Sequence, residues 1–199
     1  MSTVNETVPQ AKIKLIEVAA ELVYHQGWNA TGMNQILGDS KVPKGSFYYY
    51  YESKDDLGVS IVHLHAQKLR ECYDRTLCNG NYTGRQAFGK FFEEQLEFQR
   101  RGEWRYGCAV GSFSNEVAAT TEKIAQACRE SFEEGIGAFG VAIERGRRDG
   151  TMVQVSDTRS LATAFFSAWQ GALLAAKTFQ QEAPLRETVA WIEQGHFRR

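Results

Sequence analysis

The chain has 199 residues and a formal net charge of −1, and 43% of its residues are hydrophobic and 24% charged. This composition is ordinary for a globular protein and excludes wholesale disorder. No apolar run approaches the roughly 20 residues that span a bilayer, and the start, MSTVNETVPQ, lacks the basic and apolar regions of a secretion signal. We therefore expect a cytoplasmic protein without a membrane-spanning segment.

The first three predicted helices are short and closely spaced. Residues 12–26 carry an apolar stripe at Ile13, Ile16, Ala20 and Val23, and Gly27 suits the position just after a helix. Thr31 is the expected N-cap of a second helix, which ends near Asp39. Pro43 suits the first position of a third helix, where its missing N–H costs nothing.

The rest of the chain is also predicted to be helical. Ser53 and Asp56 form a capping-box pattern that opens a long fourth helix, running to about Leu77. Breaks at Gly80, Asn81 and Gly84, at Gly102 and Gly107, and at Gly150 and Ser156 separate helices around 85–101, 108–118, 122–148 and 157–179, and a last helix follows Pro184. We find no strand-like alternation, so we expect an all-α fold of about nine helices.

The stretch KGSFYYYYESK, residues 44–54, divides into two faces on a helical wheel. Phe47 shares one face with Tyr50 and Tyr51. The opposite face presents Lys44, Gly45, Tyr48 and Tyr49, with Ser46 at its edge. An aromatic cluster in a short helix can be ordinary core, but a helix, a tight turn and a second short helix also form a helix-turn-helix, whose second helix enters the major groove of DNA.

Residues 31–57, TGMNQILGDSKVPKGSFYYYYESKDDL, resemble the N-terminal helix-turn-helix of the TetR family of transcriptional repressors. The resemblance implies a homodimer of all-α subunits that binds a double-stranded DNA operator. It divides the chain into a three-helix DNA-binding domain, residues 1–52, and a domain that binds a small-molecule inducer and dimerises, residues 53–199. Such a protein is a regulator and not an enzyme, and no cofactor is expected.

The resemblance also assigns roles to residues at matching positions. It implies base reading by Lys44, Gly45 and Tyr48, with Ser46 beside them, and phosphate contacts by Thr31, Tyr49 and Lys54. Two positions depart from the family pattern. Lys41 stands where the family often has a turn glycine, and it can add a phosphate contact. Tyr50 stands where histidine is frequent, which leaves its role open between packing and contact.

Charge alone does not indicate a DNA-binding protein. Residues 1–57 hold five lysines and no arginine against seven acidic residues, a net charge of −2, although the segment 40–51 contains no acidic residue. Because the first arginine is Arg70, this region cannot use the common arginine–guanine contact. Base discrimination is therefore expected from Lys44, Ser46 and Tyr48, with Asn34 or Gln35 as further candidates, and from DNA shape.

The second half resembles the NemR-like branch of the family, whose members respond to electrophiles and oxidants through a cysteine. The resemblance lies in YGCAVGSFSNEVA, residues 106–118, and SAWQGALLAAK, residues 167–177. Cys108 matches the sensing cysteine and Lys177 a lysine near it. A helix start and the nearby Arg105 favour a thiolate at Cys108, which would react with electrophiles or oxidants.

Two alternatives stay open for this half of the chain. Cys108 can be a small buried residue without reactivity in a repressor that binds a reversible apolar ligand, or the protein can be a thiol-dependent enzyme, although no histidine is tied to Cys108 by a motif.

No CxxC pair and no zinc-type spacing is present, so no metal is expected. Packing is expected for the cysteines Cys72, Cys78 and Cys128, which should be reduced.

Apolar and small residues complete the expectations for the second domain. Nine aromatic residues are candidates for lining a ligand cavity, most of them as ordinary core: Phe91, Phe92, Phe98, Phe113, Phe132, Phe139, Phe165, Phe166 and Trp169. The helix 157–179 carries small residues that allow close helix approach, and it is the expected dimer helix through Ala164, Ala168, Gly171, Ala172 and Ala175. A symmetric dimer would set two recognition helices about 34–36 Å apart on a near-palindromic operator.

The assignment of Lys54 to a DNA phosphate makes a specific prediction. Lys54→Ala should weaken binding to all DNA sequences alike and lower the slope of log affinity against log salt by about 1. Binding titrations at several salt concentrations on two unrelated DNA sequences would measure this. A loss confined to one sequence would contradict the assignment.

Overall fold

The computed structural model describes residues 9–154 and 156–198, and the polar segment 1–8 considered above lies outside them. Over these residues nine α-helices form and only an isolated bridge between Met152 and Phe197 is extended, so the all-α prediction is confirmed. The helices are α1 Gln10–Gln26, α2 Met33–Ser40, α3 Lys44–Tyr50, α4 Lys54–Arg75, α5 Gly84–Arg101, α6 Ala109–Val117, α7 Glu122–Arg148, α8 Thr158–Phe179 and α9 Ala183–His196.

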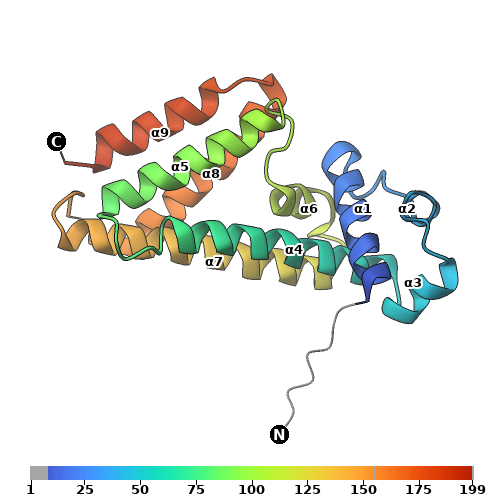
Figure 1. The fold of residues 1–199 in the computed structure, drawn as a ribbon. Coiled ribbons are helices and arrows are strands. Elements are labelled where there is room, and N and C mark those ends of the chain that lie inside the picture. The colour runs from blue at the N-terminus through green and yellow to red at the C-terminus, as the bar shows by residue number, and fades with distance from the viewer. Residues whose placement is uncertain (1–8, 155, 199) are drawn as a thin grey trace, which may run out of the picture.

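The helices form two groups joined by two long helices (Figure 1). The short helices α1, α2 and α3 gather at one end of the molecule, and α5, α8 and α9 gather at the other. Between them α4 and α7 lie side by side over much of their length, and α6 lies against both and close to α1. The arrangement places α6 between the two groups.

The start of α4 is fixed by the capping box that the sequence predicts. Ser53 Oγ accepts the backbone N–H of Asp56 at 3.2 Å, and Asp56 Oδ2 accepts the N–H of Ser53 at 2.8 Å. Lys123, at the start of α7, donates from Nζ to Asp56 Oδ1 at 2.6 Å and to Ser53 Oγ at 3.0 Å. These contacts lower the pKa of Asp56, with the Lys123 hydrogen bond as the largest cause.

Gly84 does not break the chain as predicted but is the first residue of α5. Thr83 forms an unpredicted capping box with Gln86 just before it. A Cβ atom on Gly84 would lie 2.3 Å from Gly146 Cα in α7, so no side chain fits between these backbones. The glycine therefore serves close helix packing and not a turn.

Three details of the first helices differ from the prediction. Ile13 is 42% exposed, although Ala20 and Val23 of the predicted stripe are buried. The buried face of α1 also includes Leu15 and Ala19. Gly32 and not Thr31 occupies the N-cap of α2, and Pro43 is the residue before α3 and not its first.

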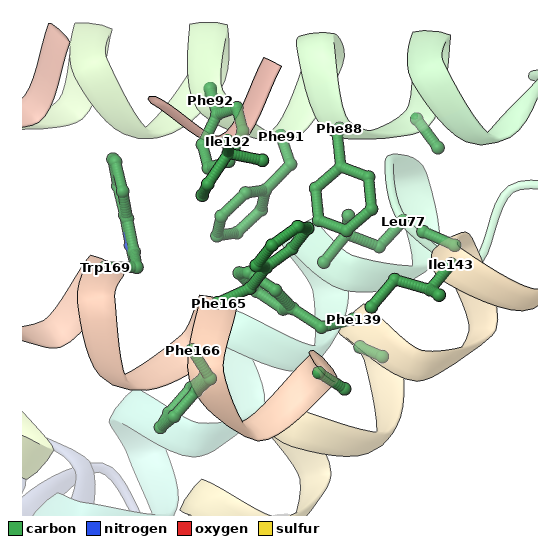
Figure 2. Close-up of a cluster of buried hydrophobic side chains, with 14 of the residues drawn as sticks. Leu77, Phe88, Phe91, Phe92, Phe139, Ile143, Phe165, Phe166, Trp169 and Ile192 are labelled. Carbon is green, nitrogen blue, oxygen red and sulfur yellow. The ribbon is translucent and has the colours of Figure 1, made fainter. Parts of the chain in front are cut away.

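The larger hydrophobic core lies among α4, α5, α7, α8 and α9 and is built mainly from aromatic rings (Figure 2). Phe88 meets Phe139 edge to face at 5.4 Å, and Phe91 meets Trp169 at 5.8 Å. Most of the aromatic residues named above are ordinary core, as expected. Only Phe91, Phe98 and Trp169 among them also line the apolar cavity of about 280 Å³ described below.

The smaller core joins the first three helices to the rest of the protein. Besides residues of α1, α2, α3 and α4, it contains Val110, Phe113 and Val117 of α6 and Ile124 and Cys128 of α7. Trp28, which follows α1, packs on Phe113 with ring centroids 5.2 Å apart. The N-terminal helices therefore share one apolar core with α6 and the start of α7, and they cannot move freely against these helices.

Candidate functional site

Helix α3 divides into the two faces that the helical wheel predicts. Phe47 is fully buried and Tyr51 is 4% exposed, whereas Tyr48 is 55% and Tyr49 81% exposed. Tyr50 is partly buried against the small core and contacts the ring of Tyr49 edge to face at 5.0 Å. The packing of Tyr50 answers the question left open above in favour of a mainly structural position.

The exposed face of α3 combines charge, aromatic rings and an open backbone. Lys44 Nζ lies 5.9 Å from the centre of the Tyr48 ring. A Cβ atom on Gly45 would meet nothing within 4 Å, so this stretch of backbone is accessible to a large partner. Ser46 lies half-buried at the edge of the face. Such a surface offers hydrogen-bond donors and flat rings to a groove and to phosphates.

Lys41 ends α2 in the left-handed conformation, with φ 55° and ψ 28°. Only glycine adopts this conformation without a steric cost, so the backbone explains why the family often has glycine there. The lysine side chain is exposed.

Two residues that were predicted to contact phosphate form hydrogen bonds within the protein instead. Thr31 is fully buried, and its hydroxyl donates to Gly27 O at 2.6 Å. The predicted N-cap role of Thr31 is therefore wrong, and the side chain is not on the surface. Lys54 is half-buried, its Nζ donates to Trp28 O at 2.8 Å and it lies 4.1 Å from the centre of the Trp28 ring. Burial is the main reason that the pKa of Lys54 falls below its usual value.

The loop after α1 is held from α6 by a carboxylate. Glu116 accepts the backbone N–H of Trp28 at 3.0 Å through Oε1 and that of Asn29 at 2.8 Å through Oε2. Lys54 donates a hydrogen bond to the carbonyl of Trp28. The backbone N–H and the backbone C=O of Trp28 are therefore both bonded to charged side chains. Sequence analysis did not single out this contact, since the two partners are far apart in the chain.

An apolar cavity of about 280 Å³ lies where α1, α4, α5, α6 and α8 meet. Its wall includes Tyr24, His65, Cys72, Tyr73, Phe91, Gln95, Cys108, Trp169 and Leu173. Exposed charged residues of α4, Lys68, Glu71 and Arg75, also belong to its lining. A pocket of this size and character is suited to a small, mainly apolar molecule.

Cys108 occupies the N-cap of α6, and its Sγ accepts the backbone N–H of Gly111 at 3.4 Å. It lines both the apolar cavity of about 280 Å³ and a neighbouring one of about 240 Å³. Burial raises the pKa of the thiol, and the hydrogen bonds from Gly111 and Gln170 oppose this only in part. The expectation that the helix start makes Cys108 a thiolate is therefore wrong, and Arg105 lies instead 3.7 Å from Glu103.

The segment before Cys108 is fixed by a side chain that sequence analysis missed. Gln99, 2% exposed, accepts the N–H of Gly107 and donates to its carbonyl, both at 2.9 Å. Gly107 has φ 67°, and a Cβ atom there would lie 3.2 Å from Lys177 Cδ. Lys177 and Cys108 both line the smaller cavity, so the structure brings these two predicted residues to one site.

The other cysteines are free thiols, with Cys72 and Cys128 buried and Cys78 partly buried. Burial raises the pKa of all three, that of Cys72 to about 11. Across residues 9–154 and 156–198 no cluster of potential metal ligands occurs. Within the same ranges no helix has the length and apolar character needed to cross a membrane.

Helix α8 presents four of its five predicted small residues outward. Ala164 and Gly171 are exposed and Ala168 and Ala175 partly so. Ala172 is only 5% exposed and belongs to the aromatic core, so it is not available to a partner in this conformation. Two large apolar residues that we did not predict join this surface: Leu174, 58% exposed, and Trp191 of α9, 52% exposed.

The contact of Glu116 with the loop after α1 should be measurable as stability. Glu116→Ala removes a charged acceptor from two backbone N–H groups, and we expect it to lower the free energy of unfolding by about 1–3 kcal/mol. Urea unfolding would measure this. Glu130→Ala, an exposed site on α7, should change it by less than about 0.5 kcal/mol. Equal effects of the two substitutions would contradict the role of Glu116.

The raised pKa of Cys108 predicts slow thiol chemistry at neutral pH. In a variant with the other three cysteines replaced by serine, alkylation by N-ethylmaleimide should lag behind that of glutathione at pH 7. The rate should increase with pH through a midpoint above the ordinary thiol pKa, because the thiolate is the nucleophile. A midpoint below the ordinary thiol pKa would contradict the effect of burial.

Comparison with known proteins assigns the family. The model described as bacterial regulatory proteins, tetR family, matches residues 15–60, and that of the LmrA/YxaF-like transcriptional regulator C-terminal domain matches residues 85–190.

Relatives of similar length agree with these matches. Transcriptional regulator AcuR of Cereibacter sphaeroides is 27% identical over 86% of this chain and 78% of its own. The repressor NemR of Escherichia coli is 26% identical over 90% of each chain, and the regulator LmrA of Bacillus subtilis is 28% identical over 86% and 89%.

Solved structures show the same fold. A TetR regulatory protein from Rhodobacter sphaeroides, 25% identical, superposes with a TM-score of 0.88 over 94% of this chain and all of the other. NemR of Escherichia coli in its reduced form superposes with a TM-score of 0.83 over 93% and 97%, at 24% identity. The chain therefore belongs to the TetR family, with an LmrA/YxaF-like C-terminal domain, and is a DNA-binding transcriptional regulator and not an enzyme.

Proposed function

We propose that this regulator is a cytoplasmic repressor that binds a near-palindromic operator as a homodimer and leaves it when a small molecule acts at the Cys108 cavity. Residues 1–52 would form the DNA-binding domain and residues 53–199 the inducer-binding and dimerisation domain. The observation that carries the proposal is the exposed face of α3. Two tyrosine rings and a lysine are presented to solvent there, while the other face of the same helix is core.

In this proposal α3 reads the major groove. Lys44, Ser46 and Tyr48 supply donors to base edges, the open backbone at Gly45 permits close approach, and Tyr49 reaches a phosphate. Lys54 fixes the loop after α1 in the free protein, and its predicted contact with a DNA phosphate requires that Nζ leave Trp28 O. Thr31 supports the same loop from inside.

The surface of α8 and α9 is the proposed dimer interface. Ala164, Ala168, Gly171 and Ala175 allow a partner helix to approach closely, and Leu174 and Trp191 supply apolar area at the same surface. A two-fold axis through this surface would pair α8 and α9 with their copies and place both α3 helices on one face of the DNA.

Helix α6 is the proposed route from the cavity to DNA. It begins at Cys108 and carries Glu116 one residue before its end, so a change at its start alters the support of the loop after α1. A ligand releases DNA only as far as it binds one conformation better than the other.

Two kinds of inducer are consistent with this route. An electrophile or oxidant that modifies Cys108 would disturb the N-cap of α6, and the position of Lys177 across the smaller cavity favours this option. The raised pKa of Cys108 and the apolar wall favour a reversible ligand with an unreactive cysteine.

A gel shift on the DNA that flanks its own gene, with and without N-ethylmaleimide, tests the proposal. If modification of Cys108 is the trigger, the wild type should bind this DNA and be released by the reagent. Cys108→Ser should stay bound, whereas Cys72→Ser, which removes a thiol from the same cavity, should behave like the wild type. Release of all three proteins would exclude modification of Cys108 as the trigger. Absence of any shifted complex would contradict the prediction that this DNA contains the operator.

A further inference from the structure

One polar group in the cavity wall has no hydrogen-bond partner among the residues that the structure describes. His65 of α4 is 5% exposed, and its Nδ1 lies 3.2 Å from the hydroxyl of Tyr24. Its Nε2 is buried and has no hydrogen-bond partner among the described residues. Leaving such a group unpaired is unfavourable, so a ligand that pairs with it gains affinity.

The imidazole is neutral in this environment. Burial, assisted by the charge of Lys68, lowers the pKa of His65 to about 4. Burial also raises the pKa of Tyr24, so its hydroxyl keeps its proton. We assign this proton to the hydrogen bond with Nδ1, which leaves the single ring proton on Nε2 as a buried donor.

The interior of the cavity contains other polar groups, but they are uncharged. Gln95 donates to Cys72 Sγ at 3.4 Å, and Gln170 and Cys108 lie nearby in the wall. The charged residues of the lining are at least partly exposed, and two of them neutralise each other, since Arg75 lies 2.5 Å from Glu94. A carboxylate placed in the interior would lose its hydration without gaining a buried cation.

We propose that the cavity recognises a neutral molecule through one acceptor oxygen, such as that of a ketone, ester, amide or quinone, which accepts a hydrogen bond from Nε2–H of His65. The proposal rests on the inducer role of the cavity and adds the chemical class of the ligand and the residue that selects it. Hydrocarbons of the same shape would leave Nε2 unpaired, and anions would be excluded by their desolvation.

Three molecules of equal heavy-atom number separate these possibilities: acetophenone, which has a carbonyl, cumene, which is a hydrocarbon, and benzoate, which is an anion. Their affinities would be measured by calorimetry on the full chain. The wild type should bind acetophenone about tenfold more tightly than cumene and should bind benzoate most weakly. His65→Leu should retain cumene and lose the preference for the ketone. His63→Leu, an exposed site on the same helix, should behave like the wild type.

A second measurement avoids any loss of folding in His65→Leu. In wild-type protein with ¹⁵N-labelled histidine, acetophenone should shift the Nε2–H signal of His65 downfield and slow its exchange with water, and cumene should not. Three results would overturn the inference. Benzoate could bind most tightly, the preference for the ketone could survive in His65→Leu, or none of the three molecules could bind. Ketone-selective binding without release of operator DNA would instead overturn the proposed inducer role and leave the selectivity of His65 standing.

Discussion

The link on which the rest of the account depends is the pair of hydrogen bonds from the backbone of Trp28 and Asn29 to Glu116. It joins the loop that supports the recognition helix to the last turn of α6. A carboxylate is a strong acceptor for two N–H groups at once, and its bonds are shorter and stronger than neutral ones. Packing reinforces the link, because Trp28 also lies on Phe113 of the same helix. The DNA-binding helices are therefore positioned by α6 as well as by their own core.

The N-terminal end of α6 lies at the cavity, where we propose that the inducer acts. Nine residues of helix span about 13 Å, and a helix of this length moves as a stiff unit. Its first turn is capped by the sulfur of Cys108, and the segment before it is fixed by Gln99. The contact between Lys123 and Asp56 provides a second connection, from α7 to the start of α4. A bonded and packed path therefore runs from the cavity through α6 to the N-terminal helices.

Features that depend on local sequence patterns could be predicted. Side-chain roles and pKa directions that depend on burial in the folded protein could not. The capping box at Ser53, the helix bounds of 122–148 and the two faces of α3 follow from spacing and are confirmed. Thr31 was misassigned because its hydroxyl bonds to Gly27 inside the fold, and Ala172 because the aromatic core covers it. The pKa of Cys108 was predicted in the wrong direction, since desolvation outweighs the helix start. Glu116, Gln99 and His65 were missed because their roles come from partners or neighbours brought together only by folding.

We propose that the cavity end of α6 controls the loop after α1, and hydrogen exchange of the amides in this loop can test the proposal. In a protein whose only cysteine is Cys108, the exchange of the Trp28 and Asn29 amide hydrogens would be compared before and after modification with N-ethylmaleimide. We expect faster exchange of these two amides after modification, because the shifted helix no longer holds Glu116 against them. Unchanged exchange of both amides in a modified protein that has released its operator would contradict it, since DNA release would then follow another path.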